Sequence, residues 1–170
     1  EYIGEWKNDL QNGRGTWTMS NGDKYIGEWK GGYPNGQMTN IYSNWSEEGI
    51  YEEGIQEGEW TSYDENGKLF GIVNYKNGQL EGLGRTYHKN GQLESETNYK
   101  NGKSHGDCRR YYDDGKIESS GERKNGNKHG IWILYHPNGN IIKKDSFYNG
   151  NLIENIIFNR VLHEDLMKKR

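Results

Sequence analysis

The chain has 170 residues, a formal net charge of -3 at pH 7 and a hydrophobic content of only 30%. This charge argues against a general binder of nucleic acids or of anionic membranes, because neither polyanion is attracted by the overall field. Chains this polar are usually disordered, but 13 Tyr, 6 Trp and 3 Phe are too many aromatic residues for a disordered segment.

The cysteine, proline and glycine contents narrow the class further. A single cysteine, Cys108, excludes an internal disulfide framework and leaves the cellular compartment open. No apolar stretch approaches the roughly 20 residues that a membrane-spanning helix requires. Twenty-five glycines and only two prolines suit many tight turns between hydrogen-bonded strands.

Glycines recur every 24 residues in two interleaved sets, Gly67, Gly91, Gly115 and Gly139, and Gly78, Gly102, Gly126 and Gly150. Seven of these eight glycines follow an Asn, and Gly115 follows Asp114. Asn-Gly and Asp-Gly predict two-residue type I′ turns, in which both central residues have positive φ. The sequence therefore predicts an all-β fold, an elongated antiparallel array of β-hairpin repeats.

Two aromatic columns follow the same period. Each unit has a central glycine, and these are Gly13, Gly36, Gly58, Gly82, Gly106 and Gly130. The first column lies seven residues before these glycines and consists of Trp6, Trp29, Tyr51, Tyr75, Tyr99 and Arg123. Five residues after these glycines, the later units carry Tyr63, Tyr87, Tyr111 and Tyr135. Equivalent residues of stacked hairpins share a face, so each column predicts a ladder along the array. Packing between neighbouring repeats is the first interpretation of both ladders, since a single hairpin buries too little surface alone.

The functional interpretation is that one ladder contacts a partner. Arg123 replaces an aromatic residue in the first column, and a long cationic side chain keeps its charged end in water. We therefore expect the first column to face a partner and the tyrosine column, which has no charged member, to pack internally. The expected partner-binding residues are Trp6, Trp29, Tyr51, Tyr75, Tyr99 and Arg123.

The first units of the chain carry a recognisable motif. Residues 2–6 and 25–29 both read Tyr-Ile-Gly-Glu-Trp, and Gly13-Arg14-Gly15 follows the first of them. These segments resemble MORN repeats. The second unit departs from the pattern after Gly36, where Gln37-Met38 interrupts the Gly-x-Gly sequence.

From about Tyr51 onward the units resemble the variant subtype of the MORN repeat, as at residues 74–82 and 98–106. The resemblance covers nearly the whole chain. It implies a hairpin array, and similar arrays act as scaffolds and membrane-apposed linkers or precede lysine methyltransferase domains of the SET class. Bacterial variant arrays are often described as antitoxin or immunity components. Fold-level analogy does not establish an activity.

The C-terminal segment breaks the period. Ile153, Ile156, Ile157 and Phe158 form an apolar patch where the earlier units are polar. Asn159 is a suitable N-cap, and the residues after it predict a short helix that caps the last hairpin. The expected organisation is a hairpin array over residues 1–158 and a helix or tail over residues 159–170. Because Glu1 already lies inside a repeat, we expect the chain to be a fragment.

Residues able to perform chemistry are present but scattered. His105 and His129 share a column, with Cys108 near the first, but a zinc site needs three or four ligands and no further ligand is evident. No nucleophile and base stand in a catalytic arrangement, and the glycines belong to turns rather than to a phosphate-binding loop. We therefore predict no enzyme, no catalytic residues, no metal and no cofactor.

The leading hypothesis is a non-catalytic module for protein–protein interaction or scaffolding, whose partner is another protein or a second copy of the chain. The alternative is an immunity or antitoxin protein that blocks a toxin, since an acidic surface suits a basic partner. A further alternative is a targeting or lipid-apposed domain of a larger enzyme. A lipid headgroup fits the resemblance, but the negative net charge counts against it, and nucleic acid is not expected as a partner.

Overall fold

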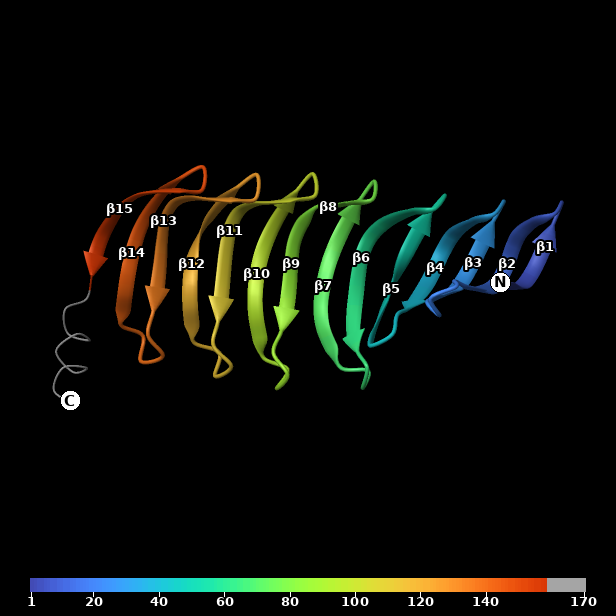
Figure 1. Ribbon diagram of the computed structural model, residues 1–170, viewed down its shortest axis with the longest axis horizontal. Coiled ribbons are helices and arrows are strands. Elements are labelled where there is room, and N and C mark those ends of the chain that lie inside the picture. The colour runs from blue at the N-terminus through green and yellow to red at the C-terminus, as the bar shows by residue number, and fades with distance from the viewer. Residues whose placement is uncertain (159–170) are drawn as a thin grey trace. The chain divides into compact units, whose positions relative to one another are not determined.

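The computed structural model describes residues 1–158, with side chains through Asn155, and the described residues form antiparallel β-strands joined by tight turns (Figure 1). In chain order the strands are β1 (Tyr2–Lys7), β2 (Leu10–Thr18), β3 (Lys24–Lys30), β4 (Tyr33–Ile41), β5 (Trp45–Glu52), β6 (Ile55–Asp64), β7 (Leu69–Lys76), β8 (Gln79–Leu80), β9 (Gly82–Tyr87), β10 (Leu93–Lys100), β11 (Lys103–Tyr111), β12 (Ile117–Lys124), β13 (Asn127–Tyr135), β14 (Ile141–Tyr148) and β15 (Asn151–Phe158).

The chain divides into two compact units, Glu1–Gly84 and Arg85–Arg170, with the boundary inside β9. In the first unit, β1 to β7 pair in sequence order and β8 pairs with β7. In the second unit, β10 to β15 also pair in sequence order. The predicted all-β hairpin array is thus confirmed. The predicted C-terminal helix and the boundary before residue 159 lie outside the described residues.

At one end of each unit's hairpins, two consecutive residues with positive φ form the turn, as the type I′ geometry requires. These turns are Asn8-Asp9, Gly31-Gly32, Glu53-Gly54, Asn77-Gly78, Asn101-Gly102, Asn125-Gly126 and Asn149-Gly150. The prediction from Asn-Gly is confirmed for the four turns at Gly78, Gly102, Gly126 and Gly150, and the other three turns were not among those predicted. The turn glycines also join neighbouring hairpins, since Gly54 N donates to Pro34 O at 2.8 Å and Gly78 N to Gln56 O at 3.0 Å.

At the other end, the prediction of type I′ turns is wrong. Gly67, Gly91, Gly115 and Gly139 have positive φ, but the Asn or Asp before each of them does not. The Gly67 N–H donates to Asp64 O at 2.9 Å, so the loop has three residues and only its last residue is left-handed. In three of these turns the Asn or Asp before the glycine accepts a hydrogen bond from the N–H two residues later, as Asn90 Oδ1 does from Gln92 N at 2.9 Å. This side-chain bond stabilises the turn without a left-handed residue before the glycine.

The small core of the first unit lies on one face of its sheet, where large side chains cover glycines of the adjacent strand. Met38 and Trp60 are both 0% exposed. Met38 pairs with Gly27 and Gly49 on its two sides, and a Cβ on Gly49 would overlap the Trp60 ring. In the second unit, Trp132 covers Gly121 in the same way. Alternating large and absent side chains let a single sheet bury an indole without a second layer.

Candidate protein-interaction surface

An aromatic cluster lies on β1, β2 and β3, on the same face as the core of the first unit. We call Tyr2, Trp6, Trp17, Tyr25 and Trp29 the N-terminal cluster. The register pairs Tyr2 with Trp17 and Trp17 with Tyr25, which brings all three strands together at this point. Tyr2 contacts Trp6 and Trp29 edge to face, with ring centroids 5.2 and 5.3 Å apart. The ring centroids of Trp17 and Trp29 lie 6.0 Å apart. These distances are typical of favourable aromatic pairs.

The cluster combines one buried indole with two exposed ones. Trp29 is 3% exposed, and its Nε1 donates a hydrogen bond to Gly15 O at 3.2 Å. Trp6 is 55% exposed and Trp17 is 40% exposed. Trp17 was missed by the sequence reasoning because it lies outside the repeating column. The signal that points to it is its spacing of two residues from Gly15, which places both residues on the same face of the strand.

The remaining members of the first column are half-buried. Tyr51 and Tyr75 lie on either side of the Trp60 ring, at 5.0 and 6.2 Å between centroids. Burial raises the pKa of the Tyr51 and Tyr99 hydroxyls above the ordinary value, so both remain neutral donors. Arg123 is also half-buried, and its Nη1 donates to Gly126 O at 2.8 Å.

The tyrosine column lies on the opposite face of the sheet. Tyr63 OH donates to Glu48 Oε1 at 2.8 Å, and Tyr111 OH donates to Glu96 Oε2 at 3.1 Å. Both tyrosines are half-buried, as are Tyr87 and Tyr135. Each of the two bonded hydroxyls therefore ties its strand to a carboxylate carried by an earlier strand of the same unit.

A buried polar network lies in the first unit of the structure, just after Gly36, where the second repeat departs from the MORN pattern. Asn40 is fully buried, and its Nδ2 donates to Glu47 Oε1 at 3.0 Å and to Tyr51 OH at 3.2 Å. Tyr42 OH donates to the same carboxylate oxygen at 3.0 Å. Burial, followed by the negative charge of Glu47, raises the Tyr42 pKa far above its ordinary range. This network joins β4 to β5 and serves packing.

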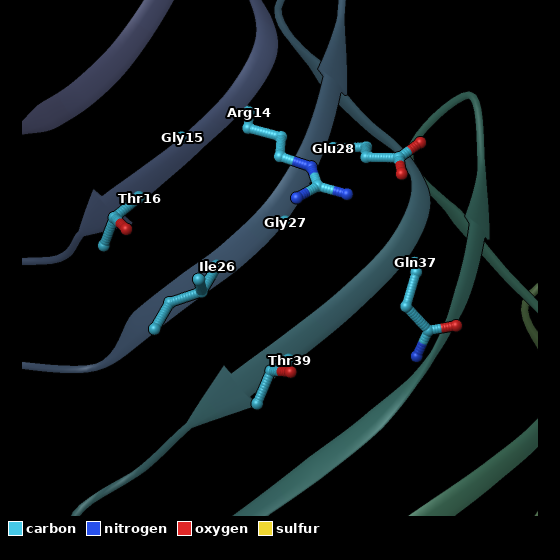
Figure 2. A pocket seen from close by; sticks show the side chains of 8 residues that line it. All are labelled: Arg14, Gly15, Thr16, Ile26, Gly27, Glu28, Gln37 and Thr39. Atoms are coloured by element: carbon cyan, nitrogen blue, oxygen red, sulfur yellow. The ribbon is translucent and has the colours of Figure 1, made fainter.

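A shallow hollow of about 490 Å³ lies on the opposite face, over β2, β3 and β4. Figure 2 shows its lining, in which Arg14 extends toward Glu28 while Thr16, Ile26 and Thr39 form a second row. No nucleophile and base meet among these residues. The hollow is open and mixed in polarity, so it offers a surface rather than an enclosed catalytic site.

The candidate metal ligands do not assemble. Over the part of the chain that the structure describes, no group of three His, Cys, Asp or Glu residues could hold a metal ion. His105 Nδ1 lies 3.3 Å from Asn125 Oδ1, and the His129 ring lies 5.5 Å from that of Tyr148. Cys108 is buried, which raises its thiol pKa and keeps it in the less reactive protonated form. Within residues 1–158 there is no helix of the length and hydrophobicity needed to cross a membrane.

Comparison with known families agrees with this architecture. The MORN repeat variant matches four segments, residues 56–77, 80–101, 104–125 and 128–149. The chain belongs to the MORN repeat family. The MORN repeat itself matches residues 2–24 and 25–37, so the predicted order of the two subtypes is confirmed. Comparison with curated proteins finds no match.

Neither MORN description matches residues 38–55, which carry the Asn40–Glu47–Tyr42 network. Met38 and Asn40 are fully buried within this segment. MORN repeats are in general modules of protein and membrane interaction and are typically non-catalytic. In this MORN protein the N-terminal cluster leaves two indoles exposed, those of Trp6 and Trp17.

Proposed function

We propose that this MORN protein is a non-catalytic module that binds a protein partner through its aromatic column. The observation that carries the proposal is the exposure of Trp6 and Trp17 beside the buried Trp29. Two exposed indoles held by aromatic neighbours lose little side-chain entropy on binding, and Trp and Tyr dominate the binding energy of protein interfaces. Trp6 contacts the partner directly, and Trp29 supports the position of the cluster.

The rest of the first column extends the proposed surface. Tyr51 and Tyr75 are half-buried, contact Trp60 and lie on the same face of the first unit as Trp6. In the second unit, Tyr99 and Arg123 occupy the same repeat positions. These residues therefore remain the proposed partner-binding row, with Trp17 added.

The test compares capture of partners by the native protein and by a double variant, W6A/W17A, from extracts of the native host. Quantitative mass spectrometry identifies proteins that the native chain retains, and calorimetry with the purified protein confirms direct binding. Y33A is the matched control, since Tyr33 is also an exposed aromatic residue but lies outside the cluster. The proposal expects binding to weaken by about tenfold or more in the double variant and to persist in Y33A. Equal binding by all three proteins would overturn it.

A second candidate, an immunity-type protein that blocks a toxin, is supported by the charge of the first unit. Residues 1–84 carry 6 Lys and Arg against 14 Asp and Glu, a formal charge of -8. A surface of this sign accelerates association with a basic partner and disfavours an acidic one. The partner that this experiment captures distinguishes the interaction module from the immunity-type protein. If the partner is a toxin, its activity should be lost when the native chain is added.

A further inference from the structure

Two cations face each other across adjacent strands of the second unit. Arg123 on β12 pairs directly with Lys128 on β13 in the strand register, and both side chains are half-buried. Like charges placed opposite each other destabilise a sheet. Neither side chain forms an ion pair within residues 1–155. The free protein therefore holds an uncompensated pair of positive charges at a partly desolvated position.

The Trp132 ring is what holds the two cations in place. Arg123 Cζ lies 5.4 Å and Lys128 Nζ lies 4.6 Å from the ring centroid, and Lys128 Nζ also lies 5.0 Å from the centre of Phe147. These are cation–π distances. Cation–π contacts orient the positive groups but do not neutralise them, so the attraction for an anion remains.

A small pocket opens beside this pair. Its volume is about 260 Å³, and its lining residues are Ser119, Lys128, Trp132, Ile133, Leu134, Lys143 and Asp145. Asp145 binds Lys143 Nζ at 2.7 Å, so this carboxylate offsets Lys143 and leaves Lys128 uncompensated. Asp145 is only 9% exposed, and its Oδ1 is buried without a hydrogen-bond partner. The pocket thus offers a cation, Lys128, beside apolar walls, while Asp145 Oδ1 is covered.

We propose that the Arg123–Lys128 pair binds a carboxylate side chain, Asp or Glu, of a peptide segment of the partner. This inference rests on the proposed function and specifies the chemistry of its partner at the Arg123 position. A volume of about 260 Å³ is small for a drug-sized ligand but accepts one or two side chains. The apolar walls, among them Ile133 and Leu134, suit a neighbouring aliphatic residue of the same segment. An inorganic anion would leave these apolar walls without a contact.

The probe is a short fluorescein-labelled peptide of alternating Glu and Leu, titrated by anisotropy against the full chain at low salt. Its counterpart with Gln in place of Glu tests the need for charge, and inorganic phosphate is the competitor. K128Q removes one cation of the pair. K124Q is the matched control, because Lys124 is an exposed lysine at the adjacent turn and the change in net charge is the same.

We expect the Glu peptide to bind the native protein and the Gln peptide to bind at least about tenfold more weakly. K128Q should weaken binding of the Glu peptide by about tenfold and K124Q by less than about twofold. Absence of binding, equal binding of the two peptides, or equal loss in K128Q and K124Q would overturn the proposal. Displacement of the peptide by phosphate at similar concentrations would also overturn it, since the site would then be a simple anion site.

A stability measurement separates binding from a structural role of the pair. Removing one of two opposed cations should leave the melting temperature of K128Q unchanged or higher. A sharp decrease would show that the lysine is held for its contacts with Trp132 and Phe147. Because W6A/W17A changes only the first unit, failure of the carboxylate site and failure of partner binding through the N-terminal cluster give different results.

Discussion

The Trp60 indole on β6 covers Gly49 on β5 so closely that a Cβ on this glycine would overlap the ring. The φ angle of Gly49 is not positive, so its backbone would accept alanine without strain. The absence of a side chain is therefore required by packing alone. This relationship makes Gly49 a direct probe of how a single-layer sheet buries a tryptophan.

We expect Gly49→Ala to lower the free energy of unfolding by about 1–3 kcal/mol, the usual cost of overpacking. Urea denaturation followed by Trp fluorescence measures this change. The control is a double-mutant cycle with Trp60→Leu, a smaller side chain that leaves room for the new methyl group. If the two changes are additive, the indole is not what excludes the side chain.

The two kinds of turn respond differently to the loss of Asn. Asn77 has a φ of 51°, whereas Asn66 precedes a turn glycine without a positive φ. Asn77→Ala should cost about 1 kcal/mol, because alanine disfavours the left-handed region, while Asn66→Ala should change stability by less than about 0.5 kcal/mol. Thermal and urea unfolding of both variants provide the test. Equal effects would contradict the assignment of the two turn types.

Alkaline pH should destabilise the first unit through Tyr42. Its pKa is raised above 10.0, so between pH 10 and the folded-state pKa the unfolded chain loses a proton that the folded chain retains. The free energy of unfolding therefore falls as pH rises above about 10. In Tyr42→Phe this fall should be shallower, whereas Tyr33→Phe should retain the native slope. Urea titrations from pH 8 to the alkaline limit compare the slopes, and equal slopes in all three proteins would refute the assignment.

The two aromatic columns should separate binding from stability. Tyr99→Ala should weaken partner binding with a modest loss of stability. Tyr111→Ala should lower the free energy of unfolding by about 2 kcal/mol, because it removes ring packing and the bond to Glu96 Oε2. Calorimetry measures the binding of each variant to the partner, and thermal unfolding measures its stability. The reverse outcome would place the partner on the opposite face.

The amino-acid sequence by itself determined the repeat, the pairing of successive strands and the type I′ turns at Gly78, Gly102, Gly126 and Gly150, because these depend on local chemistry that recurs with the period. It misassigned the turns at Gly67, Gly91, Gly115 and Gly139. Asn-Gly adopts one conformation in the two-residue loops and another in these three-residue loops, where Asn90 and Asn138 accept a hydrogen bond from the N–H two residues later.

Tertiary structure alone decided which side chains are available. Trp6 and Trp29 occupy equivalent positions of their repeats, yet one is 55% exposed and the other 3% exposed. Tyr2 contacts both rings, but Trp29 lies on β3 between two paired strands and is also contacted by Trp17, whereas Trp6 lies on the edge strand β1. The opposition of Arg123 and Lys128 likewise depends on strand register. Burial and charge pairing arise from neighbours on adjacent strands, and a repeat period specifies those neighbours only after bulges have shifted the register.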